Sequence, residues 1–217
     1  MDNLYLGSPI RKDNIKLVLN KIRKKGHCNV KENYDFDNTI SDILNRNESV
    51  AVCNGRTEWG ARALCNRSII AKAGSREIVD KINSQIKMRD FWMPFAPTIL
   101  DTKYNTCIED KKNLRPNFMT FALPAKKNAQ ESLAGAMHPV DKTCRPQIMQ
   151  SSTNKKIYNM LKRFCTKYKQ YGVLQTSFNI HGEPIVNSAT DAVSTFERSG
   201  LKFLVLENYL ITKKKLN

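Results

Sequence analysis

The sequence predicts an α/β fold in which short buried strands alternate with amphipathic helices. Short apolar runs stand next to glycines and turn-forming residues, a pattern that is typical of buried strands. Between these runs, apolar residues recur every three or four positions, which is typical of helices that pack one face on a sheet. The chain has 217 residues without an internal repeat or a long linker, so we expect a single domain over residues 1–217.

The first half of the chain is expected to open with an extended segment at 5–9. The elements after it are, in order, a helix through Ile15, Val18, Leu19 and Ile22, a short helix capped by Thr39, strands at 49–53 and 68–71, and a helix through Ile78, Ile82 and Ile86. Gly26 is expected to end the first helix, because glycine readily takes the left-handed conformation that follows a helix.

The second half is expected to resume with an extended piece at 95–100. The elements after it are, in order, an irregular polar excursion at 101–116, a strand at 118–123, a loop at 126–135, an extended segment at 145–149, a helix at 157–168 capped by Asn154, a strand at 173–174, a helix that starts at the capping box of Ser188 and Asp191, and a strand at 201–206.

The chain is strongly basic, with a net charge of +16 from 36 Lys and Arg against 20 Asp and Glu. Three interpretations are open: a nucleic-acid surface, a site for small polyanions, or a lysine-rich solvated surface. Proteins that stack single-stranded nucleic acid interleave basic and aromatic residues, and no basic run here does so. We therefore favour a solvated basic surface around a polyanion site over nucleic-acid binding.

Composition also bears on location and on metals. No apolar run approaches the roughly 18 residues of a membrane-spanning helix, and the N-terminus lacks the apolar core of a signal peptide, so we expect a cytoplasmic protein without membrane contact. The six cysteines form no C-x-x-C pair, which favours reduced, packed thiols. The three histidines form no i, i+4 pair, so we expect no transition-metal site in this chain.

Three stretches far apart in the chain, 55–62, 87–89 and 176–184, carry the side chains that a polyanion site needs. The first holds Arg56 and Arg62 between glycines, with Arg67 shortly after, and arginine forks suit phosphate oxygens. A basic surface loop with one structural ion pair through Glu58 would explain the same residues.

The other two stretches each hold a pair of polar residues separated by one position. Lys87 and Arg89 would project from the same face of an extended chain and could grip one anion, but a solvated helix end favours cations as well. Ser177 and Asn179 follow an apolar strand and could donate to a phosphate or to a metal-bound water. Spacing alone leaves both pairs open between a site and ordinary structure.

Hydrolytic chemistry is not favoured by the sequence. Ser177 as a nucleophile would need a neighbouring base, and only His181 is close in sequence, without a third partner. His138 with Asp141 could form an acid–base or ligand element, although a buried, hydrogen-bonded histidine is the favoured interpretation.

In this order, the three stretches resemble the C-terminal domain of the NodU/CmcH-type carbamoyltransferases, which carbamoylate nodulation factors and antibiotics. The likeness runs over almost the whole chain and includes two long strings, 94–97 and 177–186. The family signature is Lys-x-Arg followed far downstream by Ser-x-Asn, matched here by Lys87, Arg89, Ser177 and Asn179. The resemblance implies a YrdC-like fold, similar to that of the threonylcarbamoyl-adenylate synthases, with helices packed on a twisted, mixed sheet.

The resemblance also implies an activity. ATP with Mg²⁺ and carbamoyl phosphate would form carbamoyl-adenylate and pyrophosphate, and the carbamoyl group would pass to a hydroxyl of an acceptor such as a sugar or a secondary metabolite. The four signature residues are then the expected catalytic residues. The further residues expected to bind substrate or nucleotide are Arg56, Arg62, Arg67, Ser68, Arg145 and Thr176. Mg²⁺ would arrive with the nucleotide and would not be caged by the protein.

The chain departs from the family pattern at positions outside the signature. The family usually has proline at Ala61, glycine at Cys65 and at Lys142, arginine at Met93, alanine at Cys144 and asparagine at Gln175.

Full-length relatives also carry an N-terminal, iron-binding ASKHA-type domain that performs the transfer, and nothing in 217 residues corresponds to it. Three explanations are open: a separate subunit supplies this domain, the sequence is a fragment of a longer chain, or the transfer step has been lost. We favour the first and expect an N-terminal, Kae1-like carbamoyltransferase subunit as a partner. The alternatives are a basic RNA-binding module of the same YrdC-like fold and a non-catalytic nucleotide-binding subunit.

Overall fold

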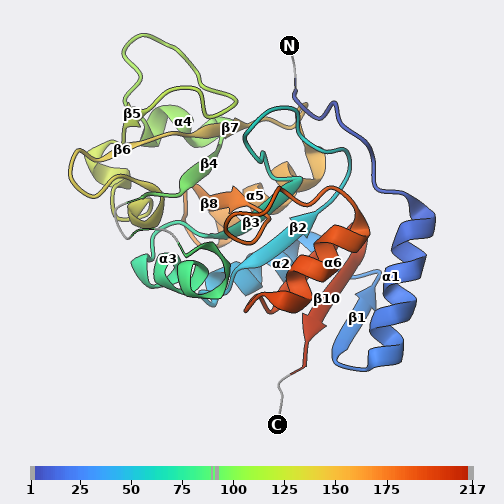
Figure 1. Ribbon diagram of the computed structural model, residues 1–217. Helices are drawn as coiled ribbons and strands as arrows, with labels where there is room; N and C mark the ends of the chain where they lie inside the picture. The colour runs from blue at the N-terminus through green and yellow to red at the C-terminus, as the bar shows by residue number, and fades with distance from the viewer. Residues whose placement is uncertain (1–2, 89, 91–92, 215–217) are drawn as a thin grey trace.

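The computed structural model describes residues 3–88, 90 and 93–214, and its centre is an eight-stranded mixed sheet (Figure 1). β2 runs parallel to β9 and β4 runs parallel to β7, and the remaining neighbours are antiparallel. The order across the sheet is β1 (Cys28–Glu32), β10 (Tyr209–Lys213), β9 (Phe203–Leu206), β2 (Val50–Cys53), β3 (Arg67–Lys72), β8 (Gly172–Ser177), β4 (Ala96–Leu100) and β7 (Gln147–Met149). The mixed α/β fold expected from the sequence is confirmed.

Helices cover both faces of this sheet (Figure 1). Val50 and Val52 of β2 join the apolar core on one face, whereas Ala51 and Cys53 join the core on the other, because successive strand residues alternate in direction. The first core lies under α2 (Phe36–Asn45) and α5 (Lys155–Lys167), and the second under α1 (Lys12–Lys25), α3 (Arg76–Ile82) and α6 (Ala189–Arg198).

Three helix ends follow the signals in the sequence. α1 ends at Gly26, which has a left-handed φ of 69°. Asn154 caps α5 by accepting the N–H of Ile157 at 3.1 Å. Ser188 and Asp191 form a complete capping box at the start of α6. These bonds satisfy backbone N–H groups that have no partner inside a helix.

The cap expected for α2 is wrong. α2 begins at Phe36, and Asp35 is its cap, since the Asp35 carboxylate accepts the N–H of Asn38 at 3.0 Å. Thr39 lies one turn inside the helix, where its N–H donates to the Asp35 carbonyl.

Two expectations for the region after β4 are also wrong. The excursion at 101–116 begins with a helix, α4 (Asp101–Cys107), that buries Tyr104 and Cys107. The strand expected at 118–123 is a turn and irregular chain apart from its last residue, because only Leu123–Pro124 (β5) pairs, with Thr143–Cys144 (β6). The loop expected at 126–135 is confirmed as loop-like, with the short 3₁₀ helices η2 (Lys127–Ala129) and η3 (Ala134–Ala136).

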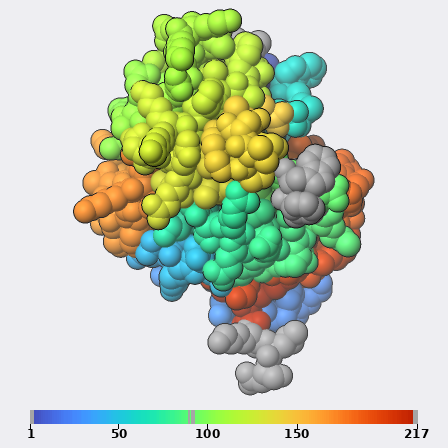
Figure 2. Space-filling model, turned by 90° about the vertical axis from the view of Figure 1, so that its left-hand side faces the viewer, coloured from blue at the N-terminus to red at the C-terminus, as the bar shows by residue number. Residues whose placement is uncertain are grey.

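The chain between β4 and β7 gathers as one lobe above α3, coloured green to yellow in Figures 1 and 2. Lys142 in this lobe has a φ of 60°, and Cys65 has a φ of 81°. The family usually has glycine at both positions, and glycine takes such left-handed conformations without steric strain. These two departures therefore place side chains where the backbone favours none.

The six cysteines are all buried and free, as expected for packed thiols. In the part of the chain that the structure describes, no helix is both long enough and apolar enough to cross a bilayer.

Candidate functional site

Lys87 reaches the site because α3 ends in a wider turn. The helix continues as a π-helix, η1 (Asn83–Lys87), which closes where Met88 takes a left-handed φ of 47° and donates its N–H to the Asn83 carbonyl at 2.8 Å. π-turns are rare and often occur at functional sites. The side chain of Lys87 is turned inward, and the residue is only 2% exposed. A solvated helix end is therefore the wrong interpretation for Lys87.

Lys87 joins Ser177 and Asn179 in a set of three residues that we call the lysine cluster. The Nζ of Lys87 donates to Ser177 Oγ at 3.1 Å, to Asn179 Oδ1 at 2.6 Å and to the Asn179 carbonyl at 3.1 Å. The Ser177 hydroxyl donates to Asn179 Oδ1 at 2.7 Å. Three of the four signature residues thus meet, although 90 positions separate Lys87 from Ser177. Arg89, the fourth, lies outside the described residues.

The strand β8 and the loop after it orient the lysine cluster. Ser177 is the last residue of β8 and lies opposite Ser68 of β3. Asn179 donates its side-chain amide to the Glu183 carbonyl at 2.7 Å, which fixes the direction of its Oδ1. The Ser177 hydroxyl is engaged with Asn179, and the His181 side chain is exposed, so the geometry gives no support to a Ser–His nucleophile.

A small hollow of about 60 Å³ adjoins Ser177, and we call it the arginine hollow. Its polar lining is Arg62, Arg145, Gln175, Thr176 and Ser177, and its apolar lining comes from residues 61, 63, 94–96 and 119. Arg62 precedes β3, Arg145 precedes β7, and Thr176 belongs to β8, so strands that are distant in sequence supply it.

The arginine hollow holds polar atoms that are buried and lack partners within the described part of the chain. They are the Nε of Arg145 and the Oγ1 of Thr176. Folded proteins pair the great majority of such atoms, so each exception calls for an explanation. Both atoms belong to residues that line the hollow, and a ligand that accepts hydrogen bonds is one explanation for them.

The electrostatics of the arginine hollow favour an anion. Burial lowers the pKa of the Arg145 guanidinium, and the positive charge of the neighbouring Arg62 lowers this pKa further. Both groups remain cationic at neutral pH because arginine is a very strong base. Two cations that repel each other beside unpaired donors form a site for phosphate or carboxylate oxygens.

Arg67 is fully buried, and each of its guanidinium nitrogens already donates to backbone carbonyls. Nη1 reaches Asn54 at 2.7 Å and Asn66 at 3.1 Å, Nη2 reaches Gly55 at 3.1 Å, and Nε reaches Asn187 at 3.2 Å. These bonds hold the loop after β2 to the segment before α6. They favour a structural role for Arg67 over the nucleotide contact expected from the sequence.

The other residues of the first arginine-rich stretch lie in different settings. Ser68 is fully buried and donates to Gln175, which lines the arginine hollow. Arg56 is exposed, pairs with Pro9 in an isolated bridge, and does not line the hollow. Glu58 forms no ion pair among the described residues; one of its oxygens accepts the N–H groups of residues 64, 66 and 67.

His138 also differs from expectation. It is partly exposed, with a side chain that is 37% accessible, and its Nδ1 lies 3.3 Å from the Asp141 carboxylate. The buried environment expected for this histidine is therefore wrong. Among the described residues, no group of three or more His, Cys, Asp or Glu side chains could hold a metal ion.

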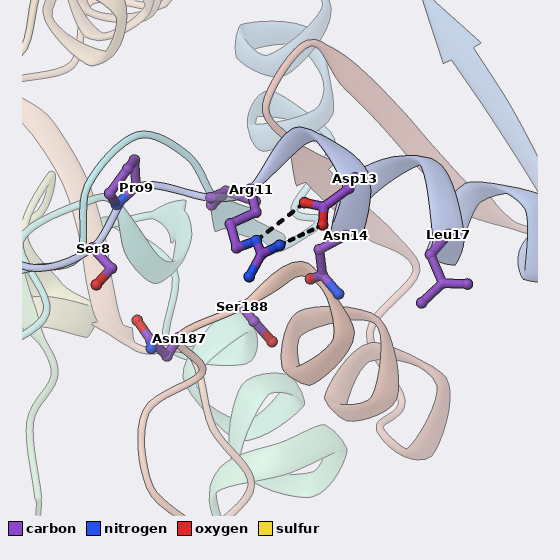
Figure 3. Close-up of a pocket in the computed structure, with 9 residues that line it drawn as sticks. Ser8, Pro9, Arg11, Asp13, Asn14, Leu17, Asn187 and Ser188 are labelled. Atoms are coloured by element: carbon purple, nitrogen blue, oxygen red, sulfur yellow. Dashed lines mark hydrogen bonds and ion pairs between the residues drawn. The ribbon is translucent and has the colours of Figure 1, made fainter.

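A larger hollow of about 470 Å³ lies between the start of α1 and the start of α6 (Figure 3). Its one guanidinium, on Arg11, is neutralised by Asp13 at 2.7 Å. Size alone would favour this hollow, but its charges are balanced and it lacks the unpaired donors of the arginine hollow. The arginine hollow and the lysine cluster are therefore the candidate site.

One apolar residue of this site, Met119, was not predicted from the sequence. Met119 lines the arginine hollow from the lobe, with a left-handed φ of 57°. No sequence signal pointed to Met119, because its segment resembled a strand. The string at 94–97, in contrast, was already conspicuous, and Pro94, Phe95 and Ala96 do line the hollow.

Comparison with known proteins identifies the family of this chain. Residues 41–213 match the family described as Carbamoyltransferase C-terminus. The chain belongs to this family. The family expected from the sequence is thus confirmed.

Several longer proteins are similar to this chain over part of their length. An uncharacterized protein of Methanocaldococcus jannaschii is 36% identical over 99% of this chain and 42% of its own length. The nodulation protein NolO of Bradyrhizobium diazoefficiens is 33% identical over 87% of this chain and 34% of its own length. The 3'-hydroxymethylcephem-O-carbamoyltransferase of Amycolatopsis lactamdurans is 31% identical over 77% of this chain and 31% of its own length. The chain therefore spans less than half the length of these relatives.

The fold also has a counterpart among solved structures. Full-length HypF in its phosphate- and nucleotide-bound form superposes with a TM-score of 0.54 over 88% of this chain and 23% of HypF, at 15% identity. At this identity the likeness concerns the fold alone, and it agrees with the YrdC-like α/β fold expected from the sequence.

Proposed function

We propose that this chain forms carbamoyl-adenylate from ATP and carbamoyl phosphate as the C-terminal part of an O-carbamoyltransferase. The observation that carries the proposal is the arginine hollow, in which two mutually repelling cations and the unpaired donors of Arg145 and Thr176 adjoin Ser177. The family and the named cephem O-carbamoyltransferase support the class of reaction.

The proposed roles follow from the charge of each group. Arg62 and Arg145 present forked donors to phosphate oxygens, and the Thr176 hydroxyl donates to a further oxygen. Lys87 supplies a buried positive charge in the lysine cluster, where it donates to Ser177 and Asn179. Ser177 therefore connects this charge to the arginine hollow, which it also lines. Arg89 is expected to act beside Lys87, and this role stays a prediction.

The proposed reaction needs positioning and charge stabilisation and no protein nucleophile. Water releases inorganic phosphate from carbamoyl phosphate, an oxygen of the resulting carbamate attacks the α-phosphorus of ATP, and pyrophosphate leaves. Negative charge shifts among phosphoryl oxygens during these steps, and preorganised cations stabilise it most effectively in a water-poor site. Mg²⁺ would enter with ATP, bound to its phosphates.

Transfer to an acceptor hydroxyl would take place elsewhere. The relatives are more than twice as long as the region they share with this chain, and the proposed partner is a separate N-terminal carbamoyltransferase subunit that supplies the remainder. The acceptor would bind to that subunit.

The test is exchange of labelled pyrophosphate into ATP by the purified chain. Exchange should require both carbamoyl phosphate and Mg²⁺, and Lys87→Ala should slow it by about 10²–10³-fold, the usual cost of removing one preorganised charge. Lys81→Ala is the matched control, because Lys81 lies on the adjacent helix α3 and pairs with Glu48 at the surface. A wild-type chain that binds neither ATP nor carbamoyl phosphate in calorimetry would overturn the proposal.

The net charge of +16 supports a second candidate, an RNA-binding module. Such a module would bind RNA with an affinity that falls steeply as salt rises and that ignores carbamoyl phosphate. A non-catalytic subunit would instead bind ATP without any exchange. Salt titration and the exchange assay together separate the three outcomes.

A further inference from the structure

Five fully buried polar side chains form a hydrogen-bonded group that reaches the arginine hollow at Gln175, and we call them the buried polar cluster. None is more than 1% exposed, and they are Cys65, Ser68, Thr98, Gln147 and Gln175. Ser68, Gln175, Thr98 and Gln147 come from β3, β8, β4 and β7, which are consecutive in the sheet. The cluster thus forms a row across four neighbouring strands.

The two glutamine amides are the centre of the cluster. The side-chain amide of Gln175 donates to Gln147 Oε1. Ser68 donates its hydroxyl to Gln175 Oε1 at 3.2 Å, and Thr98 donates to Gln147 Oε1 at 3.3 Å. The N–H of Cys65 donates to Ser68 Oγ at 2.9 Å. Each strand in the row is therefore tied to another by side-chain hydrogen bonds in addition to the backbone ladder.

The glutamines are next to the site residues in sequence and in space. Gln175 precedes Thr176, and it projects from the same face of β8 as Ser177, two positions on. Gln147 follows Arg145 by two positions. The bond between the two amides consequently joins the strand that carries Thr176 and Ser177 to the strand that follows Arg145.

Stability alone does not account for such a cluster. Buried polar groups cost free energy unless they are paired, and replacing both partners of a buried hydrogen bond by apolar groups of similar shape can be nearly neutral. Hydrogen bonds fix the distance and angle between two groups, whereas apolar contacts tolerate small displacements. A hydrogen-bonded core can therefore hold neighbouring strands at a defined separation.

We propose that Gln147 and Gln175 are positioning residues for the anion site. Their amide–amide bond sets the separation between Arg145, which lies just before β7, and Ser177 at the end of β8, so that both contact one anionic group. The identity of that anion, carbamoyl phosphate, rests on the proposed function.

The decisive variant is the double substitution Gln147→Met/Gln175→Met, which removes both amides at similar volume. The control is Ser41→Ala, which removes a fully buried hydroxyl from α2 that bonds to the Asp37 carbonyl and to no residue of the buried polar cluster. Carbamoyl phosphate and, separately, inorganic phosphate are titrated into each protein by calorimetry. The dissociation constant for carbamoyl phosphate should rise about tenfold or more in the double variant, because a displacement of about 1 Å is costly in such sites, while it stays unchanged in Ser41→Ala.

Hydrogen exchange and thermal unfolding separate positioning from folding. The double variant should unfold within about 4 °C of the wild type, yet amides in 143–149 and 172–178 should exchange faster, with the rest of the chain unchanged. Gln175→Asn retains an amide on a shorter side chain and should give an intermediate dissociation constant. If the double variant does not fold, Gln175→Asn carries the same comparison.

Two results would overturn the proposal: binding as tight as in the wild type, or unchanged exchange in both segments. If the wild type binds neither carbamoyl phosphate nor inorganic phosphate, the proposed function fails. The exchange measurement then still decides whether the two amides hold Arg145 and Ser177 in register.

Discussion

The lysine cluster and the arginine hollow share Ser177, but their cations differ in how completely they are hydrogen-bonded within the protein. In the lysine cluster, Lys87 donates to three oxygen atoms and the residue is 2% exposed. In the arginine hollow, the Nε of Arg145 has no partner among the described residues, and a second cation, Arg62, lies nearby. The hydrogen bonds of the lysine cluster are thus made within the free protein, whereas the arginine hollow leaves donors that a ligand can bind.

This difference separates contributions to folding from contributions to binding. Hydrogen bonds that are complete in the free protein stabilise it, and removing one partner leaves the others buried and unpaired. An unpaired cation does not stabilise the folded protein, and its favourable interaction energy appears only when an anion binds. The lysine cluster and the arginine hollow should therefore respond differently to the same kind of substitution.

The largest effect is expected from Lys87→Met, which should damage both folding and binding. Ser177 and Asn179 would lose their shared donor, so the free energy of unfolding should fall by about 2 kcal/mol. Pyrophosphate exchange should fall by about 10²–10³-fold. Urea unfolding and the exchange assay measure the two effects, with Lys81→Met as control. Unchanged stability would show that the bonds of Lys87 are not formed in solution.

Arg67→Met should damage folding alone. The four carbonyls that now accept from this guanidinium would lose their donors, and the free energy of unfolding should fall by about 3 kcal/mol. The affinity of the folded protein for carbamoyl phosphate should change by less than about threefold, well under one power of ten in binding. A large loss of affinity without a loss of stability would instead assign Arg67 to the ligand site.

Arg145→Met should damage binding alone. The dissociation constant for carbamoyl phosphate should rise by about tenfold or more, since a charge-assisted, forked contact is lost. The free energy of unfolding should stay constant or rise by up to about 1 kcal/mol, because a half-buried cation beside Arg62 is removed. Arg163→Met, at the exposed surface of α5, is the matched control. If Arg145→Met lowered the free energy of unfolding as much as Lys87→Met does, the proposed difference between the lysine cluster and the arginine hollow would be wrong.

The smallest effect is expected outside both regions, from Lys142→Gly. Glycine would relieve the left-handed φ of 60° at this position, and the free energy of unfolding should rise by about 0.5 kcal/mol after the entropy of the unfolded chain is counted. Lys111→Gly, a position without a positive φ, should instead lower it. Equal responses at both positions would show that Lys142 is not strained.

Much of the fold could be predicted because its signals are local. The apolar spacing from Ile15 to Ile22, Gly26 after it, and the caps at Asn154 and Ser188 each involve neighbours within a few positions. β1 was missed for the complementary reason. β1 exposes most of its residues, so it shows no apolar run, and only its pairing with β10 identifies it as a strand.

The sequence by itself indicated the signature residues of the candidate site through a family resemblance. It also indicated Arg56 and Arg67, which do not line the arginine hollow, and it missed Met119. Only the tertiary structure decided what each charge does there. Lys87 turns inward because a π-turn ends its helix. The Arg67 guanidinium donates to carbonyls from three segments, and Arg145 lies near Arg62 although 83 positions separate them in the chain. Neutralisation depends on distance in space, and spacing along a chain reports that distance only within a single helix or strand.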